Sequence, residues 1–180
     1  MTTWVALLRG VNVGGKNRLP MRDLVEIFGD AGRADPTSYI QSGNVVFRAN
    51  RATASRVPTV VGKAVADRFG FRAPVLLRSA DELETVAREN PFVRAGEDIA
   101  TLHVAFLADL PSEGRVASLE PDRSPPDEFA LRGGHIYLRC PGGYGRSRLT
   151  TQYFDSRLAT TTTVRNWRTV LALLEMTARA

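Results

Sequence analysis

The chain is organised around residues 9–17, which read Arg9-Gly10-Val11-Asn12-Val13-Gly14-Gly15-Lys16-Asn17. This segment follows an apolar run, Trp4–Leu8, that is typical of a buried strand, and it leads into a helical pattern that begins at Pro20. Its glycines allow sharp turns and can present successive N–H groups to an anion. Arg9, Lys16 and Arg18 add positive charge. We therefore expect the loop to bind a phosphate or a carboxylate.

The first 78 residues predict the order strand, helix, strand, strand, helix, strand, which is the ferredoxin-like arrangement. Two strands joined by a tight turn are expected at 38–48, with the pair Ser42-Gly43 as the turn. The expected elements are a strand at 4–8, a helix that starts at Pro20 and ends before Gly32, strands at 38–41 and 44–48, a helix at 54–69 and a strand at 73–78.

The second half partly repeats this order. Ser79 and Glu82 form a capping box that opens a helix, and Asn90-Pro91 closes it. We expect strands from Leu102, at 128–131 and at 136–139, then helices near 148–158 and 164–178, with a helix where the last strand would be. The prediction is an α+β fold of two ferredoxin-like (βαββαβ-type) subdomains, the second degenerate and ending in helices. The expected divisions are 1–78, a helical acidic connector at 79–99, and 100–180.

Composition excludes several classes of protein. Cys140 is the only cysteine among 180 residues, so no internal disulfide and no cysteine zinc site can form. No apolar run reaches the roughly 20 residues of a membrane span, and the N-terminus does not read as a signal peptide. We expect a soluble cytoplasmic protein without a membrane partner, a cofactor or a metal. The formal charge of +5 is distributed over a basic region at 1–78, an acidic region at 79–128 and a basic region at 129–180. Either the two basic regions face one anionic ligand, or the acidic region neutralises its neighbours.

The first loop also satisfies the phosphate-binding pattern G-x-x-x-x-G-K from Gly10 to Lys16. Three features oppose a nucleotide hydrolase. Asn17 replaces the Ser or Thr that would reach Mg²⁺, Pro20 starts the helix too late to place its N-terminus on the phosphates, and a hairpin follows where a parallel crossover is required. The alternatives are an anion site of another geometry and a turn that only connects strand to helix.

The segment Ser42-Gly43-Asn44 has a plain structural explanation, in which Gly43 takes a positive φ and its neighbours hydrogen-bond the turn. A two-residue turn places two sets of side chains on opposite faces: Tyr39, Gln41, Asn44 and Arg48 on one, Ile40, Val45 and Phe47 on the other. Half-polar sheet faces of this kind can bind single-stranded nucleic acid, or two of them can pack on each other across a cleft. The RNA-recognition signature is absent.

A second candidate site lies in the loop 141–148. Ser147 can cap the next helix, whose N–H groups would form an anion pocket with Arg146 and Arg148. Thr163 can cap the last helix, which places Arg165 and Asn166 in its first turn. A cation there opposes the helix dipole, so Arg165 needs an acidic partner or a bound anion. The alternative for each arginine is a solvated basic surface.

Catalytic patterns are sparse. His103 lies within a strand and His135 beside a turn, and no spacing indicates a metal site. His135 and Tyr137 are candidates for acid–base chemistry, although an ordinary surface histidine is the simpler interpretation.

Much of the chain resembles a conserved bacterial family known only as a domain of unknown function. The resemblance covers most of the sequence, with Ser38 where Thr is usual and Arg148 where Lys is usual. It implies two ferredoxin-like subdomains and no established activity. The matching segments are Leu7–Asn17, Met21, Ser38–Phe47, Arg146–Leu149 and Thr163–Val170.

From these observations we predict a basic cleft between the subdomains that binds a phosphate-bearing ligand, either a nucleotide or a nucleic acid. The alternatives are an enzyme acting on a small phosphorylated or nucleotide-like substrate and a protein–protein interaction module. The ligand, any reaction and the oligomeric state stay open. The predicted ligand-binding residues are Arg9, Asn12, Gly14, Gly15, Lys16, Asn17, Ser42, Gly43, Asn44, Arg146, Ser147, Arg148, Arg165 and Asn166.

Overall fold

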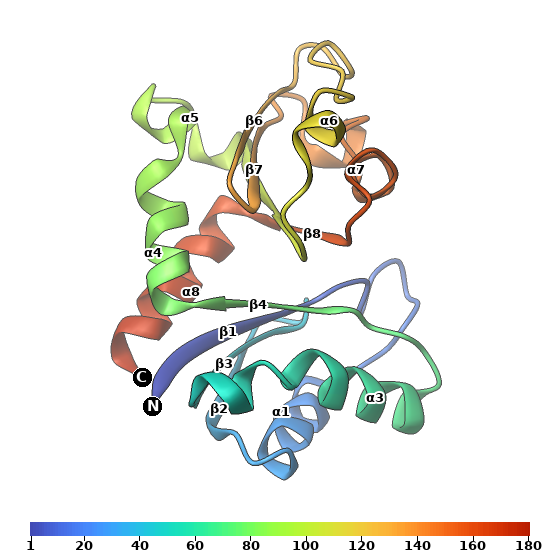
Figure 1. The fold of residues 1–180 in the computed structure, drawn as a ribbon, viewed down its shortest axis with the longest axis vertical. Coiled ribbons are helices and arrows are strands. Elements are labelled where there is room, and N and C mark those ends of the chain that lie inside the picture. Colours follow the sequence, from blue (N-terminus) through green and yellow to red (C-terminus); the bar gives the residue numbers. More distant parts are fainter. The chain divides into compact units, whose positions relative to one another are not determined.

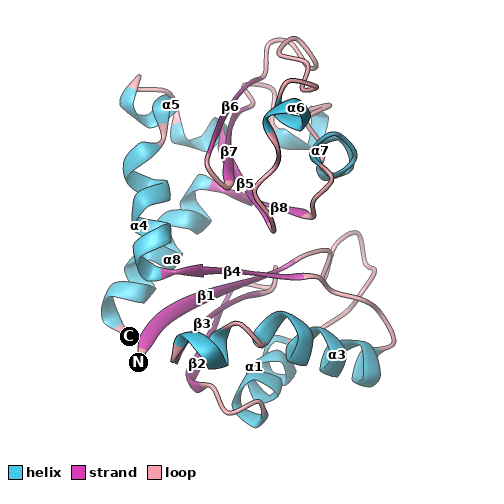
Figure 2. Cartoon of the chain, viewed as in Figure 1, coloured by secondary structure: helices cyan, strands magenta, loops and turns pink.

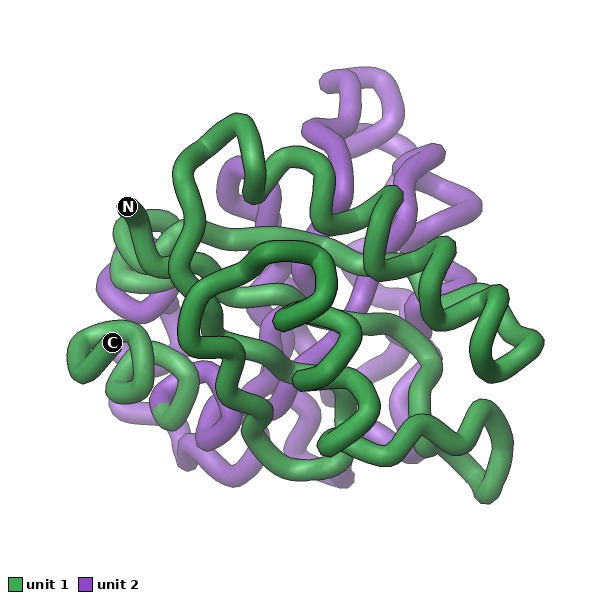
Figure 3. The backbone as a smooth tube through the Cα atoms, turned by 90° about the horizontal axis from the view of Figure 1, so that it is seen from below, with its two compact units in different colours: residues 1–84, 172–180 green, residues 85–171 purple.

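The computed structural model describes all 180 residues, and their contacts divide the chain into two compact units. Unit 1 consists of residues 1–84 and 172–180, and unit 2 of residues 85–171 (Figure 3). Each unit contains one four-stranded antiparallel sheet, in the order β2-β3-β1-β4 in unit 1 and β6-β7-β5-β8 in unit 2. Both sheets have the strand order of a ferredoxin-like fold, which confirms the predicted α+β class.

Unit 1 follows the predicted order of elements, with helices covering one face of its sheet (Figures 1 and 2). Its elements are β1 (Thr2–Leu8), α1 (Met21–Asp30), β2 (Ala34–Tyr39), β3 (Asn44–Ala49), α2 (Arg51–Ala54), α3 (Val57–Phe69) and β4 (Val75–Ser79).

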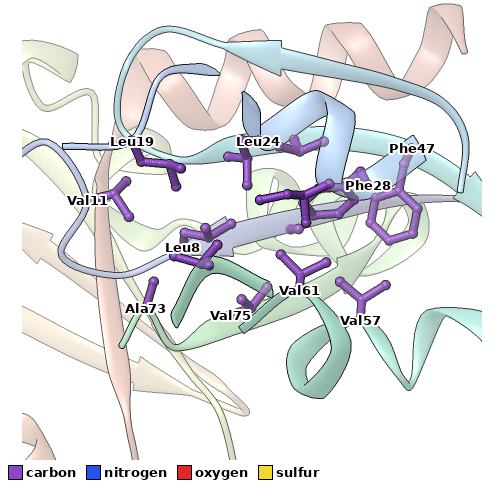
Figure 4. Packing of buried hydrophobic residues seen from close by; sticks show 14 of the residues in the cluster. Leu8, Val11, Leu19, Leu24, Phe28, Phe47, Val57, Val61, Ala73 and Val75 are labelled. Atoms are coloured by element: carbon purple, nitrogen blue, oxygen red, sulfur yellow. The ribbon is translucent and has the colours of Figure 1, made fainter. Parts of the chain in front are cut away.

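The core of unit 1 lies between the sheet and the apolar sides of α1 and α3. Alternate residues of β1, including Ala6 and Leu8, point into it, and Leu24 and Phe28 of α1 meet them from the other side (Figure 4). Val5 and Leu7, on the opposite face of β1, are fully buried as well. The apolar run that indicated a buried strand is therefore buried on both faces.

The turn between β2 and β3 is longer than predicted. Tyr39 pairs with Asn44, so the connection spans residues 40–43, and Ile40 lies outside the core with 49% of its surface exposed and a φ of 48°. Compared with the predicted two-residue turn, the partner of Asn44 is two residues earlier in the chain, so Tyr39 and Asn44 still share a face of the sheet. Farther along β2 the pairing shifts again between Ala34 and Thr37.

Gly43 brings this turn against the end of β1. Its carbonyl accepts a hydrogen bond of 2.8 Å from the Leu8 N–H, and its φ is 75°. A Cβ atom at this position would lie 2.7 Å from Cγ2 of Val11 and 2.8 Å from Cβ of Leu8. Asn44 donates to the Tyr39 carbonyl and to the Ser42 hydroxyl, as expected for a turn held by its own side chains. Only glycine fits here without displacing its neighbours.

Unit 2 begins within the helix that follows β4. The predicted capping box is present, since the Ser79 N–H donates to Glu82 at 2.7 Å and the Glu82 N–H donates to Ser79 at 3.2 Å. The remaining elements of the chain are α4 (Ala80–Glu89), α5 (Pro91–Arg94), β5 (Leu102–Leu107), α6 (Glu113–Val116), β6 (Glu128–Arg132), β7 (His135–Arg139), α7 (Thr151–Leu158), β8 (Thr162–Asn166) and α8 (Trp167–Arg179), with 3-10 turns at Ile99–Thr101 and Tyr144–Arg146. Helix α8 begins in unit 2, and its residues from 172 onward belong to unit 1.

The start of the last helix was predicted wrongly. Residues Thr162–Asn166 form strand β8, which pairs with β5, and α8 begins only at Trp167. Unit 2 therefore has all four strands of the motif, and its sequence passes from strand to helix with no intervening turn. Asn166 makes this possible, because its side chain accepts a hydrogen bond of 2.8 Å from the Thr169 N–H and so caps the helix.

The unit 2 core packs α7 against one face of its sheet. Phe154 and Leu158 of α7 meet Ile136 and Leu138 of β7, and Cys140 is fully buried among them. Burial and the nearby Asp127 carboxylate raise the pKa of the Cys140 thiol to about 11, although a hydrogen bond with Ser147 opposes the shift. No helix in the chain is both long enough and apolar enough to cross a bilayer.

We expect Gly43→Ala to lower the free energy of unfolding by about 2–4 kcal/mol, because a left-handed residue is strained and its Cβ has no space. Gly70→Ala is the matched control, since Gly70 has nearly the same φ, 76°, with nothing within 4 Å of its added Cβ. Gly70→Ala should lower the free energy of unfolding by only about 1 kcal/mol. Urea unfolding measures both. Equal losses would show that the close approach of Gly43 to β1 is unimportant.

We expect the stability of the protein to depend on the Cys140 thiol between pH 9 and 11. The unfolded thiol ionises near its ordinary value of 9.0, whereas the folded thiol holds its proton to about 11. The unfolded state therefore loses protons first, and stability falls as the pH rises through this range. Relative to that of Cys140→Ala, the free energy of unfolding of the wild type should fall by about 2 kcal/mol between pH 9 and 11. Urea unfolding under reducing conditions measures the difference, and a constant difference would contradict the expectation.

Candidate functional site

The glycine-rich segment forms a small hairpin of its own between β1 and α1 (Figure 1). The Asn12 N–H donates to the Asn17 carbonyl and the Lys16 N–H to the Val13 carbonyl, each at 3.0 Å. Gly14 and Gly15 form the tip with φ values of 58° and 74°. Two successive left-handed residues are what a type I′ turn requires, so the glycines are needed to close the hairpin.

Two apolar side chains fasten the base of this hairpin. Val11 precedes it and Leu19 follows it, with 2% and 1% of their surfaces exposed. Both lie at one end of the unit 1 core beside Leu8 (Figure 4). The segment between them, from Val13 to Arg18, is exposed throughout. The hairpin is thus an exposed projection on a buried base.

The Asn12 carboxamide joins the two ends of the base. Its Nδ2 donates to the Leu19 carbonyl at 2.9 Å, and its Oδ1 accepts from the Leu19 N–H at 2.8 Å. The same Nδ2 also donates to the Gln41 carbonyl at 2.7 Å. Asn12 therefore brings the hairpin and the turn at 40–43 together, as the predicted site requires. Asn17 makes a lesser contribution, through one bond of 2.9 Å to the Gly10 carbonyl.

The polar groups of the projection point to solvent. Lys16 and Arg18 are exposed, and their side chains make no hydrogen bond or ion pair within the chain. The Gly14 and Gly15 N–H groups likewise donate to no other group of the protein. Arg9, before the hairpin, is half-buried, and its N–H donates to the Pro74 carbonyl at 2.8 Å. The available donors are therefore concentrated at the tip rather than at the base.

The backbone of this loop differs from that of a phosphate-binding loop in a nucleotide hydrolase. The helix begins only at Met21, with Pro20 as its N-cap residue, and the strand before the hairpin belongs to an entirely antiparallel sheet. These were the features that opposed the nucleotide-hydrolase interpretation.

The second predicted loop belongs to unit 2, and its backbone is occupied internally. The Arg146 N–H donates to the Gly143 carbonyl, the Ser147 N–H to the Tyr144 carbonyl, and the Arg148 N–H to the Ser124 hydroxyl. Helix α7 begins later than predicted, and Thr150 rather than Ser147 caps it by accepting a bond of 3.2 Å from the Tyr153 N–H. The predicted cradle of free amides is therefore not formed by these residues.

The charges around this second loop are mixed. The Arg146 and Arg148 side chains are exposed. Arg148 lines a pocket of about 550 Å³ that also includes Glu120 and Asp122. Glu120 already pairs with Arg123 at 3.3 Å. Acidic side chains beside Arg148 make this pocket less favourable to an anion than the hairpin tip.

Arg165 and Asn166 have structural roles that the sequence interpretation missed. Arg165 lies in β8, not in a helix, and only 6% of its surface is exposed. Its guanidinium donates to the Thr163 hydroxyl at 2.8 Å and to the Val164 carbonyl at 2.9 Å. Burial lowers the pKa of Arg165 to about 10. Asn166 is the residue that caps α8.

The candidates for acid–base chemistry are placed differently. His135 and Tyr137 share a face of β7, but Tyr137 is 1% exposed and donates to the Val86 carbonyl at 2.9 Å. Burial raises its pKa to about 12. His103 stacks on Tyr144 with ring centroids 5.1 Å apart. No three His, Cys, Asp or Glu side chains are grouped to hold a metal ion.

The predicted set contains the tip of the hairpin and Asn12, but not the groups that hold Asn12 at the base. Leu19 and the Gln41 carbonyl hold Asn12 in place, yet neither belongs to the predicted set. The signal for Leu19 was present, because an isolated apolar residue between Arg18 and Pro20 has reason to be buried. A backbone carbonyl such as that of Gln41 carries no signal in the sequence.

Comparisons with known proteins extend this description. No curated protein matches the chain. Among solved structures, the conserved bacterial protein SP0830 from Streptococcus pneumoniae is similar, with a TM-score of 0.72 and 24% identity over 98% of each chain. At that identity the similarity concerns the fold. The family model described as protein of unknown function (DUF1697) matches residues 1–137, which include the hairpin, its base and most of the unit 2 sheet. The chain therefore belongs to this family of proteins of unknown function, DUF1697.

Proposed function

We propose that the chain binds a phosphate-bearing ligand, in particular a nucleic acid, through the hairpin at residues 12–17. The observation that carries this proposal is the combination of donors at the exposed tip: the Gly14 and Gly15 amides together with Lys16 and Arg18. None of these four groups has a partner within the chain. Phosphate oxygens accept bonds from backbone amides and from cationic side chains alike, whatever the base sequence.

The shape of the hairpin favours a polymer over a small molecule. Small ligands are held in concave sites that bury most of their surface, whereas Val13–Arg18 projects into solvent. A projecting two-stranded hairpin can instead follow a groove or a phosphate backbone. The excess of basic over acidic side chains in residues 1–78 adds a long-range attraction for such a ligand.

The rigid base also supports binding. A flexible loop loses conformational entropy when a ligand orders it, and that loss subtracts from affinity. The hydrogen bonds of Asn12 and the burial of Val11 and Leu19 fix the hairpin before any ligand arrives. The Gly14 and Gly15 amides are therefore held in place at little further cost.

We expect Lys16→Gln to weaken oligonucleotide binding by roughly two- to fivefold, the usual value of one exposed ionic interaction. Fluorescence anisotropy with labelled single-stranded and duplex oligonucleotides, between about 50 and 200 mM salt, measures the affinity and its salt dependence. The slope of log affinity against log salt should decrease in magnitude by about one for each phosphate that the variant no longer neutralises. The double variant Lys16→Gln with Arg18→Gln should therefore show about twice the change.

Lys63→Gln is the matched control for charge. Lys63 is the other lysine of the chain, lies on α3, and pairs with Asp67. Its removal changes the net charge equally but leaves the hairpin intact. The proposal fails if the wild type binds no oligonucleotide, or if Lys63→Gln weakens binding as much as Lys16→Gln does.

We expect Asn12→Asp to lower the free energy of unfolding by about 1–3 kcal/mol, because a carboxylate cannot donate to the Leu19 and Gln41 carbonyls. Asn17→Asp is the control, because the φ of Asn17, 51°, is close to the 54° of Asn12. Whereas the Asn12 variant loses one half-buried and one exposed hydrogen bond, the Asn17 variant loses one exposed hydrogen bond. Its loss should be less than half as large, as measured by urea unfolding. Equal losses would mean that Asn12 does not fix the base of the hairpin.

A further inference from the structure

Unit 1 contains a second basic feature, in a different part of the unit from the hairpin. A pocket of about 430 Å³ lies where the end of α1 and the start of β2 approach α2 and the first turn of α3. This volume is within the range of small-molecule sites. The residues that line the pocket are Ala31, Arg33, Ala52, Thr53, Arg56 and Val60.

Arg33 is buried in this pocket with a donor unused. Only 8% of its surface is exposed, and its Nη1 donates to the Ala31 carbonyl. Its Nε is buried and has no hydrogen-bond partner. A buried charged donor without an acceptor is costly, so such a group needs an explanation.

Arg56 adds a second positive charge to the same pocket. It forms no ion pair and no side-chain hydrogen bond, and no carboxylate lines the pocket. Burial, and then repulsion from Arg56, lower the pKa of Arg33. Two arginines that line one cavity without an acid repel each other, and an anion between them would offset that repulsion.

Helix α3 contributes to the same field. Arg56 is its N-cap residue, and no side chain caps the helix or places an acid in its first turn. Pro58 occupies that turn. No acidic side chain of its own first turn therefore offsets the positive end of this 13-residue helix. By itself a helix terminus would mean little, but here it lines the same pocket as Arg33.

We propose that this pocket binds the phosphate group of a small phosphorylated molecule, with Arg33 and Arg56 as its counter-charges. A phosphate monoester carries nearly two negative charges at neutral pH, which matches two guanidinium groups better than a single carboxylate does. The planar fork of arginine suits bidentate contact with phosphate oxygens. Thr53 offers a hydroxyl, and the apolar residues Ala52 and Val60 offer a wall for the rest of the molecule. This site is separate from the hairpin and is concave where the hairpin is exposed.

Calorimetric titration of the full chain tests the proposal, with inorganic phosphate as the first probe and acetate as the comparison. We expect saturable one-to-one binding of phosphate and much weaker binding of acetate. A sugar phosphate and a nucleoside monophosphate then distinguish which molecule carries the group, because the wall of the pocket should favour one over inorganic phosphate.

Arg56→Gln should weaken phosphate binding by about tenfold or more, because it removes a charge-assisted hydrogen bond. Arg72→Gln is the matched control, since Arg72 is exposed, has no partner and lies outside the pocket. It should leave phosphate affinity unchanged, and so should Lys16→Gln in the hairpin. Without phosphate, Arg56→Gln should unfold at the same temperature as the wild type or higher, because it relieves repulsion. At a given concentration, added phosphate should raise the unfolding temperature of the wild type more than that of Arg56→Gln.

The proposal is overturned if phosphate does not bind the wild type saturably, or if Arg56→Gln binds it as the wild type does. It is also overturned if Lys16→Gln abolishes the binding, because phosphate would then occupy the hairpin. If the wild type binds phosphate but no oligonucleotide, the hairpin proposal alone fails. The two proposals can therefore fail separately.

Discussion

The hydrogen bonds of the Asn12 carboxamide fix the part of unit 1 on which the candidate site depends. One side chain satisfies the Leu19 N–H and carbonyl and reaches the Gln41 carbonyl of a different loop. The Leu19 groups lie at the end of the core, where an unsatisfied peptide group would be costly, whereas the Gln41 carbonyl belongs to an exposed residue of the turn. Gly43 completes the arrangement, because its missing side chain lets the β2–β3 turn approach Leu8 and Val11. The exposed tip is therefore supported by a connected set of contacts at its base.

The two units carry equivalent features at equivalent strands. Arg78 of β4 lies opposite Val5, and Arg165 of β8 lies opposite Val104, each next to the central strand β1 or β5. Each guanidinium donates to the carbonyl of the residue before it, at 2.7 Å in Arg78 and 2.9 Å in Arg165. Burial lowers the pKa of both. The strand order and these two arginines together support a structural duplication that the sequence itself does not display.

Local patterns predicted the architecture well, because alternation and helical spacing depend on burial that neighbouring residues share. The strand at Leu102–Leu107, the capping box at Ser79 and the helical stripe of α1 are examples. Strand β8 was missed because its five residues run directly into α8. The β2–β3 turn was misjudged because Ile40, a β-branched residue, adopts a left-handed conformation that its type rarely takes.

The candidate sites were predictable only in part, for a related reason. The tip of the hairpin combines glycines and cations within a few residues, so its composition is visible along the chain. The pocket of Arg33 and Arg56 has no such signal, because its two cations come from segments separated by β2 and β3. Whether an arginine ends up paired or unpaired depends on how the chain folds. Thr163 looked like a helix cap on the same local grounds and instead accepts a bond from Arg165.

The irregular pairing of β2 affects how the protein behaves in the presence of other copies of itself. β2 is an edge strand, and a regular edge offers a row of free N–H and C=O groups on which another strand can assemble. The register shift between Ala34 and Thr37 interrupts that row, Asp35 takes a φ of 50°, and Pro36 has no N–H to offer. An incoming strand would find few consecutive partners there. This edge of unit 1 is therefore protected against the strand-by-strand growth that leads to aggregation.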